Sequence, residues 1–232
     1  MAELFLVRHA QASFHSADYD CLSALGERQS RWLGEYFAER GIGFDVLVTG
    51  TLRRHRQTLD GVLRGMGRDA GAAAIVHPGL DEYDFRALVA AWAAAHGDDP
   101  RVLAWRADPA SKPAFYRLLR LAIPAWAADA LPGPLPESWA GFMGRTAAAV
   151  AALQALTAQG SRLLAISSGG AMSALLGGRL ELAPAHIADL NMQVRNTSVS
   201  HFHLNRERFL LSSWNSVPHL ERAGRDDAIT YG

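Results

Sequence analysis

Two apolar runs in this chain end abruptly in polar or small residues. The first covers residues 4–7 and is followed by Arg8 and His9, and the second covers residues 163–166 and precedes a Ser-Ser-Gly-Gly sequence. Uninterrupted apolar runs of this length are typical of strands that are buried on both faces. Because ligands bind beyond the carboxyl ends of strands in open α/β sheets, the pattern predicts a functional site where these two strands end.

Helical and strand patterns alternate along most of the remaining chain. The second apolar run belongs to an expected strand over residues 162–167. The other expected strands cover residues 45–49 and 75–76, and a C-terminal hairpin pairs 199–204 with 209–214. The expected helices run from an N-cap at Ser23 to Gly41, over about 52–66, over about 138–158 and onward from near Gly170. This alternation predicts an α/β fold with a largely parallel central sheet, helices on both of its faces and an antiparallel hairpin at its C-terminal edge.

Residues 86–136 differ in character from the rest of the chain. They are rich in alanine, carry three tryptophans and Phe115 at helical positions, and end in a Pro-rich turn. We expect a helical cap inserted over one end of the sheet, within a single domain that covers residues 1–232. The aromatic side chains are predicted to form the cap's own small core. Basic residues in this region, such as Arg117, either meet anionic groups of a ligand or lie in solvent.

Charge and cysteine content narrow the classes of partner and site. The chain has 23 basic and 23 acidic residues, so we expect neither a nucleic acid nor a membrane surface as its partner. The single Cys21 cannot form an internal disulfide, and a thiolate zinc site is not expected. His201 and His203 share a strand face without a third ligand, so no metal or cofactor is expected. Without a signal peptide or a membrane-length apolar run, the sequence predicts a soluble, cytoplasmic protein.

Arg8 and His9, at the end of the first strand, are the first candidates for chemistry. A neutral imidazole can attack phosphorus, while an adjacent guanidinium holds phosphoryl oxygens through paired hydrogen bonds. Three more arginines, Arg53, Arg54 and Arg56, lie in the first turns of a predicted helix, where the backbone already carries partial positive charge. Both groups of cations indicate a bound anion, although a solvated helix face and a small nucleic-acid patch are alternative interpretations of the second group.

Several segments that carry these residues resemble the histidine phosphatase superfamily, also called phosphoglycerate mutase-like. Residues 6–10, 22–29 and 52–58 are similar to that family's Arg-His-Gly, Leu-Thr-x-x-Gly-x-x-Gln and Leu-x-Arg-x-x-Gln-Thr patterns, in the same order and at typical separations. Shorter segments between Gly169 and Leu220 resemble later parts of the family pattern. The resemblance covers nearly the whole chain apart from the insertion.

The resemblance implies roles for individual residues. It makes His9 the nucleophile that becomes a phosphohistidine, Arg8 and Arg54 the phosphate clamps, and Glu82 the acid that protonates the leaving oxygen and then activates water. Phosphoryl transfer needs mainly positioning and charge neutralisation, plus one group that manages a proton, so these residue types suit the reaction. The rival acids are Asp81 and Asp84, and the other expected phosphate contacts are Gln11, His15, Ser168 and the Gly169 amide.

Three positions depart from the family pattern. Ser168 stands where the family usually carries a second histidine, His15 stands where it often has asparagine, and Ala10 replaces the glycine after the nucleophile. A serine can donate a hydrogen bond but cannot carry a positive charge. The replacement is expected to weaken phosphate binding by about 1.5–3 kcal/mol and to slow turnover by roughly 10²–10³-fold. Whether His15 restores a cation stays open.

The sequence therefore predicts a metal-independent phosphomonoester hydrolase of the histidine acid phosphatase type, with slowed turnover. Its partner would be a small phosphorylated substrate or inorganic phosphate. The alternative is a phosphate-binding or regulatory protein of the same fold with little or no catalysis, and the departure at Ser168 is what motivates it. A mutase fits less well, because a mutase must protect its phosphoenzyme from water.

Overall fold

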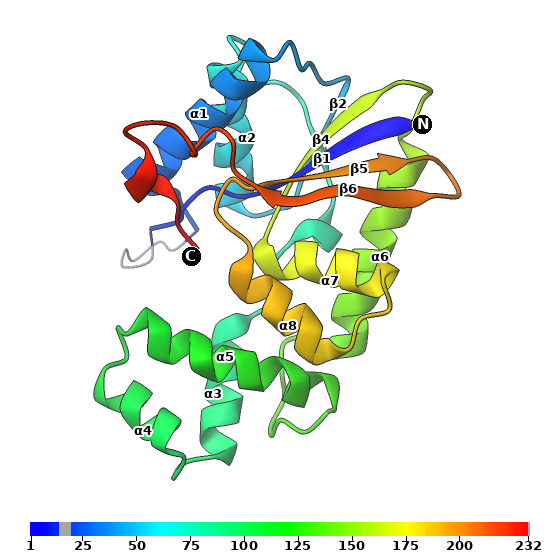
Figure 1. Ribbon diagram of the computed structural model, residues 1–232. Coiled ribbons are helices and arrows are strands. Elements are labelled where there is room, and N and C mark those ends of the chain that lie inside the picture. The colour runs from blue at the N-terminus through cyan, green and yellow to red at the C-terminus, as the bar shows by residue number, and fades with distance from the viewer. Residues whose placement is uncertain (14–19, 232) are drawn as a thin grey trace.

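A six-stranded sheet forms the centre of the computed structural model, which describes residues 1–13 and 20–231 (Figure 1). The strand order across the sheet is β3-β2-β4-β1-β5-β6. The strands are β1 (Ala2–Arg8), β2 (Val46–Thr49), β3 (Ile75–Val76), β4 (Arg162–Ser167), β5 (Val199–Leu204) and β6 (Phe209–Ser216). The first four strands are parallel to one another, and β5 and β6 form an antiparallel hairpin against β1, as the sequence predicted.

Helices connect the strands and cover both faces of the sheet. They are α1 (Ala24–Glu39), α2 (Arg53–Gly65), α3 (Phe85–Ala95), α4 (Pro100–Ala107), α5 (Lys112–Ala127), α6 (Trp139–Ala155), α7 (Gly169–Arg179) and α8 (Pro184–Gln193), with short 3-10 helices η1 (Pro78–Leu80) and η2 (Asp226–Ala228). The helix α1 begins where predicted, because the Ser23 hydroxyl accepts a hydrogen bond from the Gly26 amide.

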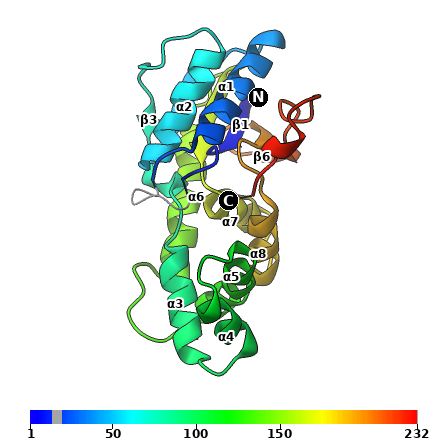
Figure 2. The same cartoon turned by 90° about the vertical axis from the view of Figure 1, so that its left-hand side faces the viewer.

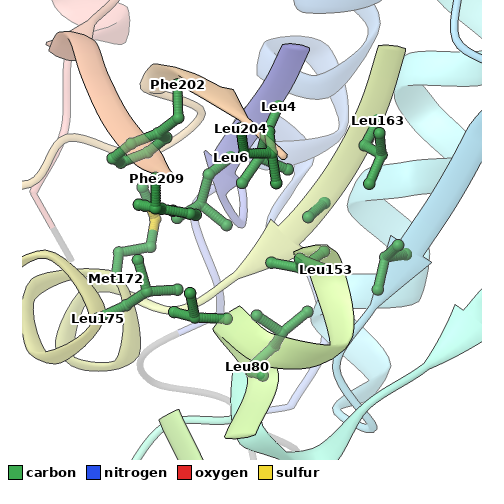
Figure 3. Close-up of a cluster of buried hydrophobic side chains, with 14 of the residues drawn as sticks. Leu4, Leu6, Leu80, Leu153, Leu163, Met172, Leu175, Phe202, Leu204 and Phe209 are labelled. Carbon is green, nitrogen blue, oxygen red and sulfur yellow. The ribbon is translucent and has the colours of Figure 1, made fainter. Parts of the chain in front are cut away.

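Alternating side chains of β1 divide between two hydrophobic clusters. Leu4 and Leu6 point to the face that α6 and α7 cover, where they join Leu153 and other residues that Figure 3 labels. Phe5 and Val7 point to the opposite face and pack against side chains from α1 and α2. Each buried leucine of this kind contributes roughly 1.5–3 kcal/mol of hydrophobic stabilisation relative to exposure. The uninterrupted apolar run of the sequence is therefore a strand buried on both faces.

The insertion forms a cap of three helices, α3, α4 and α5. Figure 2 shows these helices gathered at one end of the molecule, opposite to α1 and α2. Trp92 and Trp126 are buried in a cluster that also takes Phe142 from α6, whereas Trp105 is only partly buried. A helical cap is thus present as the sequence predicted, but its aromatic side chains share one core with α6, α7 and α8 and do not form a core of the cap's own.

The parallel register brings the ends of three strands to one edge of the sheet. Arg8 at the end of β1 lies opposite Ser167 at the end of β4, and Thr49 at the end of β2 lies opposite Ile166. The residues after these strands therefore meet beneath the cap. In the part of the chain that the structure describes, no helix is long and apolar enough to cross a membrane.

Candidate active site

A cavity of about 270 Å³ lies between this edge of the sheet and the cap. It is lined by Arg8, His9, Arg54, Glu82, Tyr83, Phe85, Pro113, Tyr116, Arg117, Leu119, Arg120, Asn191, Met192 and Tyr231. A second hollow of about 430 Å³ is lined by residues of α1 and α2 with mixed charges and contains none of the candidate residues. The smaller cavity is the candidate site because it brings together the histidine, two arginines and one acid that the sequence singled out.

His9 lies at the floor of this cavity and is only 4% exposed. Its Nδ1 lies 2.8 Å from the Ala10 carbonyl oxygen, and because a carbonyl can only accept, Nδ1 carries the hydrogen. The Nε2 atom therefore holds a lone pair, and it accepts a hydrogen bond of 3.2 Å from Nε of Arg54. Burial, together with the positive charges of Arg54 and Arg8, holds the pKa of His9 well below its ordinary value of 6.5. At neutral pH the imidazole is neutral and nucleophilic at Nε2.

Arg54 comes from the first turn of α2, where the cap of the helix is supplied from a distant loop. Leu52 occupies the N-cap and makes no side-chain cap bond. The Asp20 carboxylate caps the helix in place of the Leu52 side chain, because it accepts hydrogen bonds from the amides of Arg53 (2.8 Å) and Arg54 (3.4 Å). The same carboxylate pairs with Nη1 of Arg54 at 2.8 Å. The Asp20 carboxylate thus holds the Arg54 guanidinium at the positive end of the helix, with Nε of Arg54 directed to His9.

Arg8 is fixed by backbone carbonyls from two distant parts of the chain. Its Nη1 donates hydrogen bonds to the carbonyl of Val194 and, at 2.8 Å, to that of Tyr231. Its Nε is buried and lacks a hydrogen-bond partner among residues 1–13 and 20–231. Because a buried guanidinium nitrogen without a partner is costly, this atom is suited to an anion that enters the cavity.

The three candidate acids occupy different environments. Asp84 is exposed and caps α3 by accepting from the Ala87 amide at 2.9 Å. Asp81 accepts hydrogen bonds from the amide and hydroxyl of Thr51 and is not part of the cavity lining. Glu82 alone of the three lines the cavity, and its carboxylate accepts from the Gly170 amide at 3.1 Å.

Burial raises the pKa of Glu82 above its ordinary value of 4.5. The Gly170 amide and the nearby charges of Arg54 and Arg8 oppose this effect without reversing it. The close approach depends on glycine at position 170, because a Cβ there would lie only 2.2 Å from Oε1 of Glu82. An acid with a raised pKa beside a nucleophile is the arrangement that general acid catalysis requires.

Ser168 and Gly169 follow β4 as predicted, but neither residue belongs to the cavity lining. Ser168 is fully buried, and its Oγ lies 2.7 Å from Nε2 of His55, a residue of α2. Gly169 packs close to the guanidinium of Arg8 and to Asn191. Gln11 is also outside the lining, since its side-chain oxygen accepts from the Ser23 hydroxyl at 2.7 Å. His15 lies outside the described residues.

Sequence reasoning missed several residues in and around the cavity, among them His55, Tyr83, Asn191 and Tyr231. Asn191 donates a hydrogen bond to the Tyr83 hydroxyl at 2.7 Å, and burial raises the pKa of that phenol well above 10. A signal existed only for His55, which follows Arg54 directly and supplies an imidazole in a chain that lacks one at position 168. The other three come from the segment before α3, from α8 and from the C-terminal segment, whose docking no local pattern predicts.

The arrangement on the β5 face does not amount to a metal site. The rings of His201 and His203 lie 4.8 Å apart, beside Glu3 of β1. Among the described residues, no group of three or more His, Cys, Asp or Glu side chains is placed to hold a metal ion.

Comparison with solved structures identifies the fold. A phosphoserine phosphatase from Entamoeba histolytica, crystallised with 3-phosphoglyceric acid, is 18% identical, and the match covers 95% of this chain and 100% of that one with a TM-score of 0.64. A phosphoglycerate mutase from Bacillus anthracis is 18% identical, with 94% of each chain covered and a TM-score of 0.64. A mycobacterial glucosyl-3-phosphoglycerate phosphatase is 21% identical, with 92% of this chain and 98% of that chain covered and a TM-score of 0.60. No curated protein matches the chain significantly.

The family comparison agrees with the segments that carry the sequence resemblance. The family model for the histidine phosphatase superfamily (branch 1) matches residues 4–217, which include the end of β1 with Arg8 and His9, the helix of Arg54 and the Gly169–Gly170 start of α7. With most of its length matched, the chain belongs to the histidine phosphatase superfamily (branch 1).

Proposed function

We propose that this member of a phosphatase superfamily is a phosphomonoester hydrolase that works through a phosphohistidine on His9 and needs no metal ion. The observation that carries the proposal is the state of the His9 imidazole, which is neutral, has its lone pair on Nε2 and lies between two guanidiniums in a cavity. A nucleophile in this state can attack phosphorus without first losing a proton.

In the first half-reaction, Nε2 of His9 attacks the phosphorus atom and the bond to the leaving oxygen breaks. Arg54 shifts its Nε hydrogen bond from Nε2 to a phosphoryl oxygen, while Nε of Arg8 holds another. The protonated carboxyl of Glu82 gives its proton to the leaving oxygen. Its raised pKa favours the protonated form that this step uses.

In the second half-reaction, water hydrolyses the phosphohistidine. The Glu82 carboxylate takes a proton from the water, the water oxygen bonds to phosphorus, and the N–P bond breaks to release orthophosphate. His9 returns to its neutral form with Nδ1 still bonded to Ala10, so the cycle restores every group.

The substrate that the cavity suits is a small phosphomonoester with an apolar part. The cavity has apolar walls from Phe85, Tyr116 and Leu119 of the cap and from Met192 of α8, and its lining also includes Arg117. The named solved relatives act on or bind small phosphorylated molecules, including 3-phosphoglyceric acid. A cytoplasmic site of action stays a prediction from the sequence.

The test is hydrolysis of p-nitrophenyl phosphate in the presence of a chelator, with His9→Ala as the matched variant. We expect turnover by the wild type, none above background by His9→Ala, and an acid-labile phosphoenzyme on rapid quenching. Hydrolysis that survives His9→Ala would refute the proposed nucleophile, and hydrolysis that needs an added metal ion would refute the metal-independent mechanism.

One observation favours a second candidate function, a phosphate-binding protein with little turnover. The Ser168 hydroxyl is bonded to His55 and does not line the cavity, so the donors that face a phosphoryl group are fewer than the sequence predicted. Tight orthophosphate binding without hydrolysis across a panel of phosphomonoesters would support this alternative.

A further inference from the structure

Three polar side chains form a continuous chain behind His9. Oδ1 of Asp81 lies 3.6 Å from Nδ1 of His55, and Nε2 of His55 lies 2.7 Å from Oγ of Ser168. The ring centroids of His55 and His9 are 5.6 Å apart. The Ser168 hydroxyl is hydrogen-bonded to the ring, whereas Nδ1 of His55 has no hydrogen-bond partner among the described residues, so the Asp81 carboxylate acts on the ring through its charge at 3.6 Å.

Local features of the chain leave room for this arrangement. A Cβ on Gly50 would lie 2.3 Å from both Oδ1 of Asp81 and Nδ1 of His55, so only glycine lets the two groups approach. Ser168 occupies the N-cap of α7, yet its hydroxyl makes no cap bond to that helix. The hydroxyl is committed to His55 in place of the bond that a serine at an N-cap usually makes.

The proton positions follow from the partners. With His55 neutral, the Asp81 carboxylate favours a hydrogen on Nδ1, so Nε2 accepts from the Ser168 hydroxyl. With His55 protonated, Nε2 donates to Oγ of Ser168, and the hydroxyl hydrogen becomes free to turn toward another acceptor. Uptake of one proton thus changes both the charge and the donor direction of the pair.

The charges around His55 determine when this uptake occurs. Arg54 on the same helix repels a proton and, together with burial, holds the pKa of His55 well below 6.5. Asp81 on one side attracts it, Ser168 on the other is uncharged, and His9 is neutral. A phosphoryl dianion on His9 or beside Arg54 would neutralise the guanidinium that now opposes protonation.

We propose that His55 is the second histidine of the site, a positioning residue that takes up one proton when a phosphoryl group binds next to His9, with the charge of Asp81 favouring the protonated ring and Ser168 accepting its hydrogen bond. The charge that position 168 lacks is thereby supplied from α2, one residue after Arg54. This inference rests on the proposed function for its phosphoryl ligand, but it concerns the protonation state of a particular ring.

The direct test is an NMR titration of the labelled imidazoles with and without saturating orthophosphate, repeated with vanadate. We expect the pKa of His55 to rise by at least one unit when the anion is bound, and by less in Asp81→Asn. His219 is the matched control, because it is equally buried and bonded to the Thr197 hydroxyl at 2.8 Å but lines no part of the cavity. Its pKa should not move.

A reciprocal exchange tests the functional consequence. His55→Ala should lower kcat/KM for p-nitrophenyl phosphate by about 10²-fold, the size of effect expected when one preorganised positive charge near the phosphoryl group is lost. Ser168→His alone should also be impaired, because its ring would collide with His55. The double variant, with the imidazole moved to position 168, should recover most of the activity. His55→Gln keeps an N–H donor at this position but cannot take up a proton. Its activity should therefore stay as low as that of His55→Ala, which separates an effect of proton uptake from an effect of packing.

The outcomes distinguish this inference from the proposed function. Hydrolysis by the wild type with an unchanged His55 pKa in bound orthophosphate would overturn the inference alone. A raised pKa without hydrolysis would overturn the hydrolase proposal alone. If neither orthophosphate nor vanadate binds, both fail. If His55→Ala does not fold, the NMR titration of the His55 imidazole in the wild type and in Asp81→Asn still tests the inference.

Discussion

Replacing Gly170 with alanine tests whether the Glu82 carboxylate must occupy its observed position. The new Cβ would lie 2.2 Å from Oε1 of Glu82 and 2.3 Å from a ring carbon of Tyr83. Ordinary van der Waals contact begins near 3.4 Å, so the carboxylate must retreat by about 1 Å. The amide of residue 170, which now donates to Glu82 at 3.1 Å, would lose its alignment at the same time.

The expected effect on catalysis depends on the leaving group. A displacement of ~1 Å in a catalytic group costs about 10²-fold in rate, and general acid catalysis contributes roughly 10²–10⁴-fold. We expect kcat/KM for alkyl phosphates to fall by about 10²-fold in Gly170→Ala. For p-nitrophenyl phosphate, whose leaving oxygen needs little protonation, the fall should be less than about tenfold. The added methyl should also lower the free energy of unfolding by about 1–3 kcal/mol through overpacking.

The assay compares kcat/KM for the two substrate classes in the wild type, in Gly170→Ala and in Gly144→Ala. Gly144 is a matched control, because it is an exposed glycine within α6 whose added Cβ would meet nothing within 4 Å. It should keep wild-type rates and gain about 0.5–1 kcal/mol of stability. A folded Gly170→Ala with unchanged kcat/KM for alkyl phosphates would refute the assignment of Glu82 as the acid.

Three further predictions concern the surroundings of the site. Asp20→Ala removes the carboxylate that caps α2 and pairs with Arg54. It should lower the free energy of unfolding by about 1 kcal/mol in urea titrations and raise KM for phosphomonoesters. An unchanged urea midpoint would contradict the capping role. Arg117→Glu should raise KM about fivefold for a substrate with a second anionic group and leave KM for p-nitrophenyl phosphate nearly unchanged; equal effects on both substrates would argue against a contact with that group. Burial lowers the pKa of His219 from 6.5 to about 3, so the unfolded chain binds more protons between these values and the free energy of unfolding falls as the pH drops through this window. His219→Gln should flatten that pH dependence in urea titrations at pH 7, 5 and 4, and an unaltered slope would show that other groups cause it.

Strong local patterns predicted the sheet and the position of His9 directly after its first strand. The apolar run before Arg8 and the alternation of strands and helices determine a parallel sheet whose strand ends meet, and the family motif identified Arg54. The boundaries moved by a few residues: β6 extends to Ser216, and α6 ends at Ala155, short of the expected Ala158. Single-domain organisation over residues 1–232 stays a prediction.

Long-range docking explains what the sequence did not predict. The Ser168 hydroxyl was expected to face a phosphate, but the imidazole of His55, 113 residues away in the chain, lies at hydrogen-bond distance from it. Asp81, Glu82 and Asp84 could not be distinguished from their order alone, since only the packing of α7 against the segment after η1 decides which carboxylate reaches the cavity. Such partners are set by tertiary contacts, which neither periodicity nor capping signals encode.

The contact between Arg8 and the Tyr231 carbonyl has a practical consequence for work with this protein. Because Tyr231 lines the cavity, whatever is joined to the chain after it starts close to the cavity. The first residues of β1 lie at the opposite end of that strand from Arg8. Affinity tags and fluorescent fusions therefore belong at the amino terminus, away from the cavity.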